Sequence, residues 1–151
     1  MVRHAVDRVT AAVGGLYRRV AERLRQLREV GYRVDGGLDG VPYHRVKVTF
    51  RQEGGGRDWE DVFMYWFRMD TNAMDYLAYA FGQGPGEEPG TRFREAYNVR
   101  RVNGVRMADY RNYTVDTLSA DQMEEYPDLW ARDAARLVSR IELDSVQVRP
   151  L

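Results

Sequence analysis

The stretch "DVFMYWFRMD", residues 61–70, constrains the fold of this chain more than any other part of its sequence. Seven of the eight residues between its two aspartates are apolar or aromatic. Side chains alternate between the two faces of a β-strand, so a half-buried strand alternates apolar with polar residues. This stretch is apolar on both faces, and both need a cover, from more protein or from a ligand that binds aromatic surfaces. The two sets are Phe63, Tyr65, Phe67 and Met69 on one face and Val62, Met64, Trp66 and Arg68 on the other.

The segment just before it, residues 43–51, alternates with a period of two and predicts a second strand. Its apolar side carries His44, Val46, Val48 and Phe50, and its other side carries Tyr43, Arg45, Lys47, Thr49 and Arg51. The glycine-rich "QEGGGRD" separates the two segments as a flexible turn. We therefore expect an antiparallel hairpin over about residues 42–69.

A second hairpin is predicted over about residues 92–115, because Asn103-Gly104 is the strongest short signal for a tight two-residue turn. That turn places Val102 opposite Val105, Arg100 opposite Met107, Asn98 opposite Asp109 and Arg94 opposite Tyr113. Cross-strand partners share a face. One face then carries Arg94, Asn98, Arg100, Met107, Arg111 and Tyr113, and the other, expected in the core, carries Phe93, Tyr97, Val99, Ala108 and Tyr110.

Three helical regions are expected around these hairpins. Apolar residues at three- and four-residue steps predict a helix over about 3–30, which suits packing on a sheet and also a coiled-coil dimer seam. A capping aspartate and a final glycine predict a short helix over about 71–81. The Ser119-x-x-Gln122 capping box opens a helical region over about 119–142, with its main helix from about 128 to 141. The predicted fold is one α+β domain, 1–151, with an antiparallel sheet of about four strands (two hairpins) and helices mainly on one face.

Charge and composition exclude several classes of protein. The 23 basic and 23 acidic residues give no net charge, which argues against binding polyanions by bulk charge. Lys47 is the only lysine, and biased genome composition or life at high temperature would explain this excess of arginine without any function. The absence of cysteine excludes disulfides and cysteine–zinc sites. No apolar run reaches the roughly 18 residues that span a bilayer, and no secretory signal is evident, so we expect a cytoplasmic protein with no membrane partner.

The familiar catalytic motifs are missing from the sequence. There is no phosphate-binding loop and no Gly-x-Ser-x-Gly, and two histidines are too few for a histidine-rich metal site. A carboxylate cluster could hold magnesium, but its members flank the two ends of one strand, where solvated acids and caps are usual. We therefore predict no enzyme, no metal and no cofactor. The acidic set is Asp58, Glu60, Asp61, Asp70 and Asp75.

The remaining feature is a sheet face on which arginines alternate with aromatic residues. We expect the Trp66 side of residues 62–69 to be exposed, because the Phe63 side has no charge and suits the core. Arginines can follow phosphates while rings stack on unpaired bases, at roughly 1–3 kcal/mol per base. This predicts non-catalytic, sequence-tolerant binding of single-stranded DNA or RNA, with DNA favoured and Tyr43, Trp66 and Tyr113 as stacking platforms. A protein-interaction or oligomerisation face remains the alternative, and a carboxylate–metal enzyme the third. The predicted site is Tyr43, Arg45, Lys47, Arg51, Trp66, Arg68, Arg94, Asn98, Arg100, Arg111 and Tyr113.

The segments "YHRVKVTFR", "DVFMYWFRMD" and "TRFREAYNVRRVNGVRM" together resemble the archaeal ThermoDBP-type single-stranded DNA-binding proteins. The resemblance is one of layout over most of the chain: a compact chain of this size, an antiparallel sheet with helices, and an aromatic, basic cleft. It implies sequence-tolerant binding of single-stranded DNA, with bases drawn into the cleft, by an archaeal, homo-oligomeric protein. The residues of the predicted site come from the strand pattern alone.

Overall fold

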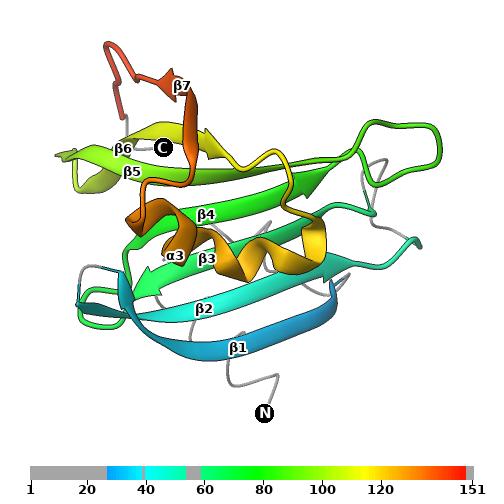
Figure 1. Cartoon of the computed structure of the whole chain (residues 1–151). Coiled ribbons are helices and arrows are strands. Elements are labelled where there is room, and N and C mark those ends of the chain that lie inside the picture. The colour runs from blue at the N-terminus through cyan, green and yellow to red at the C-terminus, as the bar shows by residue number, and fades with distance from the viewer. Residues whose placement is uncertain (1–26, 39, 54–58, 149–151) are drawn as a thin grey trace.

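A computed structural model describes residues 27–38, 40–53 and 59–148 of the chain. They form one antiparallel sheet of seven strands whose spatial order is the order in the sequence, so each strand pairs with the next (Figure 1). A helical segment lies between the last two strands, and it consists of a 3-10 helix and a short α-helix. The elements are β1 (Leu27–Leu38), β2 (Val41–Phe50), β3 (Val62–Arg68), β4 (Met74–Phe81), β5 (Gly90–Val102), β6 (Val105–Thr114), η2 (Ala120–Glu125), α3 (Tyr126–Ala131) and β7 (Arg136–Ile141).

The helical segment crosses one face of the sheet, in front of β3 and β4 in Figure 1, and we call this side the helical face. Ser119 begins η2 with a capping box to Gln122, and Met123 and Tyr126 point into the sheet with no exposed surface. Tyr126 Oη lies 2.6 Å from Thr91 Oγ1 of β5, which ties the segment to the sheet. The core cluster forms between this segment and the sheet.

The strand register aligns the core side chains in rows across the sheet. One row runs from Lys47 through Met64, Ala78 and Phe93 to Tyr113. A neighbouring row runs from Arg45 through Trp66, Tyr76 and Glu95 to Arg111. Trp66 and Phe93 are completely buried, and their rings meet edge to face at 5.7 Å. The centre of each row is therefore the hydrophobic core of the protein.

The predicted fold class, four strands with helices on one face, is wrong, and residues 71–81 show why. The steps between Met74, Leu77 and Phe81 fit a helix, yet residues 74–81 form β4. Hydrogen bonding to β3 on one side and to β5 on the other outweighs the local preference. Ala78 and Ala80 of β4 are fully buried, and their small side chains leave room for η2 above the strand.

The predicted helix over residues 128–141 is also wrong. Asp133 has φ of 56°, and its N–H donates to Trp130 O, so the helix ends in the left-handed turn that is common at helix termini. Residues 136–141 then pair with β6 as β7. Most of the predicted helix over residues 3–30 lies outside the described residues, but residues 27–30 belong to β1.

No helix in the described part of the chain is long and apolar enough to cross a membrane.

Candidate functional site

The helical face holds most of the predicted site, but two of its three predicted stacking rings are buried there. Trp66 has no exposed surface and Tyr43 only 3%, so neither ring is available to stack on a base. Tyr113 Oη donates to Glu95 at 2.9 Å while its ring meets Trp130 edge on. Burial raises the pKa of Tyr113, and Glu95 raises it further. The prediction that the Trp66 side of β3 is exposed is therefore wrong, because η2 and α3 cover it.

Four arginines of the predicted site already have carboxylate partners. Such a partner neutralises the guanidinium and occupies donors that a phosphate would need. Two others lie apart from these pairs, since Lys47 is half-buried on β2 and Arg51 is exposed just beyond its end. The ion pairs are Arg45 with Glu124 (3.1 Å), Arg68 with Asp70 (2.7 Å), Arg100 with Asp109 (3.0 Å) and Arg111 with Glu95 (3.2 Å).

The predicted register of the second hairpin holds at the turn and fails four residues away from it. Val102 pairs with Val105 and Arg100 with Met107. A bulge then occurs at Asn98, which has φ of 48° and donates to Asp109 Oδ2 at 2.7 Å. Beyond the bulge Arg94 pairs with Asn112 and not with Tyr113. Because the register slips by one residue, Arg94 lies on the opposite face from Tyr113 and Arg111.

The acidic residues considered for a metal do not gather into a site. Asp75 accepts a hydrogen bond from Tyr43 Oη at 3.1 Å and forms an ion pair with Arg106 at 2.7 Å. Burial, with Asp75 nearby, raises the pKa of Tyr43. A hydrogen bond from Arg68 lowers the pKa of Asp70 to about 2. Asp58 lies outside the described residues, among which no group of three His, Asp or Glu side chains could hold a metal ion.

The opposite side of the sheet, which we call the aromatic face, carries six half-buried rings from β2, β3 and β4. Two rows place them there, one from Val48 through Phe63 and Tyr79 and one from Val46 through Tyr65 and Leu77. The alternation that buries Trp66 on one side therefore puts its neighbours on the other. The six rings are Phe50, Phe63, Tyr65, Phe67, Tyr79 and Phe81.

These six rings form one unbroken set of ring contacts, with Phe63 at its centre. Its ring lies 6.2 Å from both Tyr65 and Tyr79, with interplanar angles of 7° and 22°, and it meets Phe50 edge on at 5.9 Å. Tyr79 continues to Phe81 at 6.0 Å. Aromatic contacts at such spacings add stability beyond the area they bury. The face is thus a continuous apolar layer of half-buried rings, and its β2 side, at Val46 and Val48, is buried.

Two arginines of β5 border the rings. The register places Arg92 opposite Tyr79 and Arg94 opposite Leu77. The Arg92 guanidinium lies 5.1 Å from the centre of the Phe81 ring, and that of Arg94 lies 4.9 Å from the centre of Tyr79. Gly90 leaves room for this arrangement, since a Cβ there would clash with the Phe81 ring.

The hydrogen-bond partners of these two arginines are neutral. Arg92 Nη1 donates to Thr91 O at 2.8 Å and to Thr114 Oγ1 at 3.2 Å. Arg94 donates from Nε to Asn112 Oδ1 at 2.7 Å and from Nη2 to the Tyr79 hydroxyl at 3.2 Å. Within the described ranges neither guanidinium has a carboxylate partner. This side of the sheet therefore combines apolar rings with unneutralised positive charge.

Residues 33–142 match the model of a family of unknown function, DUF6503. The chain belongs to this family. The segment shared with DUF6503 begins within β1 and ends just after β7, so it contains both faces of the sheet. No curated protein and no solved structure matches the chain.

Of the predicted site residues, only Arg94 lies on the aromatic face of this DUF6503 protein. The sequence pattern did not predict a binding role for four residues of this face: Arg92, Phe50, Tyr79 and Phe81. A signal was present in "TRFREA", where two arginines alternate with Phe93, a pattern that puts both on the face away from a buried ring. It was not interpretable without the Asn98 bulge and without knowing that residues 74–81 form a strand.

Proposed function

We propose that this protein is a non-catalytic binding module that holds an apolar small molecule on its aromatic face. The observation that carries the proposal is the unbroken set of six half-buried rings on that face. Small-molecule sites are lined mainly by apolar and aromatic side chains, with a few polar groups that fix orientation. Arg92 and Arg94 are such polar groups at the border of the rings.

The size of the ring surface favours a small molecule over a protein partner. From the level of Phe50 and Phe81 to Phe67 the ring surface extends roughly 20 Å along the strands, and β2 to β4 span about 10 Å across them. A specific protein interface buries about 800 Å² on each partner, which is several times this area. The ring surface alone is therefore too small for a stable interface and large enough for one small ligand.

Single-stranded nucleic acid is a less favourable ligand for this geometry. Trp66 and Tyr43, the predicted platforms, are buried, and most of the predicted arginines bind carboxylates. The hypothesis stays testable, because a binding measurement separates the two ligands directly.

The experiment is a fluorescence titration with N-phenyl-1-naphthylamine, a neutral probe that brightens in apolar surroundings. We expect saturable binding to the full chain. Phe63→Ser removes the ring at the centre of the aromatic face and should weaken binding of the probe by at least about tenfold. Val99→Ser, at a residue that is 52% exposed on the second hairpin, should leave probe binding unchanged. Circular dichroism and a thermal melt check that both variants are folded.

Three results would overturn the proposal. One is a probe that does not bind saturably, or that binds equally well to Phe63→Ser. Another is tight, salt-sensitive binding of a labelled single-stranded oligonucleotide, measured by fluorescence anisotropy, that Phe63→Ser leaves intact; this would return the function to nucleic-acid binding. The third is a dimer in sedimentation that dissociates in Phe63→Ser, which would make the aromatic face an oligomer interface.

A further inference from the structure

We propose that Arg92 and Arg94 form an anion-binding subsite, and that the ligand is an amphiphile with an apolar tail and a carboxylate or phosphate headgroup. This inference rests on the proposed function, because the tail would lie on the aromatic face while the headgroup lies at its border. It adds the chemical class of the ligand.

Charge supports this subsite. Of the arginines whose side chains the structure describes, six form ion pairs. In the same described part of the chain, Arg51, Arg101, Arg132 and Arg140 form none but are exposed, whereas Arg92 and Arg94 form none although they are half-buried. An arginine that is partly removed from water without a counterion is costly, and an incoming anion offsets that cost. The six paired residues are Arg45, Arg68, Arg100, Arg106, Arg111 and Arg136.

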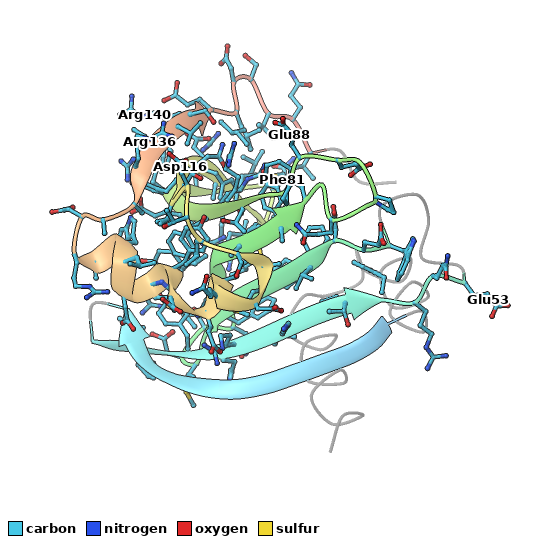
Figure 2. All side chains as sticks on the ribbon, turned by 45° about the vertical axis from the view of Figure 1, so that its right-hand side comes forward. Glu53, Phe81, Glu88, Asp116, Arg136 and Arg140 are labelled. Carbon is cyan, nitrogen blue, oxygen red and sulfur yellow. The ribbon has the colours of Figure 1, made fainter. Side chains whose placement is uncertain are left out.

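An exposed arginine elsewhere on the surface has the acidic partner that Arg92 and Arg94 lack among the described residues. Figure 2 shows Arg136 beside Asp116 near the edge strand β7, where their side chains lie 3.1 Å apart. Both are largely exposed, and an exposed pair contributes little to stability. Even this weakly held surface arginine has an acidic partner, whereas the half-buried Arg92 and Arg94 have only neutral ones.

Several N–H donors of Arg92 and Arg94 remain free within the described part of the chain. A guanidinium has five N–H groups. The neutral partners use Nη1 of Arg92 and Nε and Nη2 of Arg94, and they hold both planes in place. Nε and Nη2 of Arg92 and Nη1 of Arg94 have no acceptor among the described residues. A carboxylate or phosphate is the acceptor that matches these forked donors best.

Arg92 and Arg94 are also close enough to each other to bind one headgroup. Arg92 and Arg94 are two residues apart on β5, hence on the same face and roughly 7 Å apart along the strand. Their guanidinium groups lie over neighbouring rings, Phe81 and Tyr79, whose centres are 6.0 Å apart. One headgroup can therefore reach both cations while its tail lies over Tyr79 and Phe63.

Isothermal titration calorimetry of the full chain with dodecanoate, dodecyl phosphate and 1-dodecanol tests this inference, with the two anions below their micelle concentrations and the alcohol below its solubility limit. The three share one tail and differ in headgroup, so any difference in affinity belongs to the headgroup. We expect one or both anions to bind about 10- to 100-fold more tightly than the alcohol, the range expected for charge-assisted hydrogen bonds. The stronger of the two anions identifies the headgroup as a carboxylate or a phosphate.

The double variant R92Q/R94Q should lose the preference for the anions, so that its affinities for the anions and for the alcohol become similar. Arg101→Gln is the matched control, because Arg101 is on the same strand, exposed, and bonded only to Gly104 O. If R92Q/R94Q does not fold, R92K/R94K keeps both charges and should keep part of the preference.

The outcomes separate the two proposals. Equal affinity for all three ligands, or an anion preference that survives in R92Q/R94Q, overturns the anion subsite and leaves the aromatic binding face standing. Failure of all three ligands and of the neutral naphthylamine probe overturns the proposed function itself. Binding of the alcohol with loss of anion preference only in R92Q/R94Q supports both.

Discussion

On the helical face Trp66 and Phe93 are completely buried beneath η2 and α3, whereas Tyr65 and Tyr79 on the aromatic face are only half-buried. Both faces carry aromatic side chains on β3 and β4. The charged residues beside them differ, since Arg45 and Arg111 have carboxylate partners and Arg94 has a neutral one. This comparison teaches that aromatic content alone does not mark a binding surface. What a ring packs against, and whether the neighbouring charge is neutralised, separates core from candidate site.

The comparison is tested most strongly by removing one ring from each face of β3. Trp66→Ala should lower the free energy of unfolding by about 3–5 kcal/mol, because it opens a cavity in the core. Phe67→Ala, the next residue along and half-buried, should cost roughly half as much. Chemical denaturation of both variants measures the difference. Equal losses would mean that the aromatic face is as much core as the helical face.

The hydrogen bond that holds the helical segment on its face is the next test. Tyr126→Phe removes the hydroxyl that lies 2.6 Å from Thr91 Oγ1 while leaving the ring, so it should cost about 1–2 kcal/mol of stability. Tyr97→Phe is the control, because the hydroxyl of Tyr97 bonds to Glu142 at the exposed end of the sheet. Thermal unfolding should show a smaller shift for the control. A larger shift for Tyr97→Phe would remove the special role of Tyr126.

A single methyl group can disturb the aromatic face without touching the helical one. Gly90→Ala places a Cβ against the Phe81 ring, which must move away from Arg92. We expect a stability loss of about 1 kcal/mol, in the range of overpacking, together with weaker binding of the naphthylamine probe. Gly86→Ala is the contrasting variant: it has open space for a Cβ, and its φ of 83° strains any side chain, so it should affect stability but not binding. Unchanged probe binding in Gly90→Ala would argue against a role for Phe81.

The smallest expected effect is the local loss, at low pH, of the hydrogen bond between Asp109 and the Leu143 N–H. Asp109 is buried and accepts bonds from the Leu143 N–H, Asn98 and Arg100, which lower its pKa. A carboxyl with a lowered pKa stabilises the fold above the ordinary value of about 3.9, and this contribution is lost as the pH falls through the lower folded value. Below that value Leu143 should detach from β6 while the core stays intact.

The Leu143 amide resonance reports this event in an NMR titration from pH 7 to pH 2. We expect its inflection below the ordinary carboxyl range. Asp109→Asn should abolish the inflection. An inflection at the ordinary carboxyl pKa would show that the three donors do not act on Asp109 as the structure implies.

Some features of this fold were accessible from the sequence because they depend on neighbouring residues. The alternation of residues 43–51 and the double-sided apolar pattern of 62–69 correspond to β2 and β3, which pair in antiparallel register. The turn at Asn103-Gly104 and the capping box at Ser119 are likewise local, and both occur. The candidate site was much less accessible. It depends on β4 and β5 as neighbours of β3, and residues 74–81 carry a pattern that fits both a helix and a strand.

By itself the sequence determined the turn at Asn103-Gly104 and the alternation of residues 43–51, because glycine at Gly104, with φ of 81°, and the period of two act over a few residues. Only the tertiary structure decided which face of β3 is covered, because both faces are apolar and the choice depends on where η2 and α3 pack. It also decided the side on which Arg94 lies, since one bulge at Asn98 shifts the register of everything before it. Pairing between strands distant in sequence outweighed local propensity, and it brought Arg92, Arg94 and the aromatic rings together.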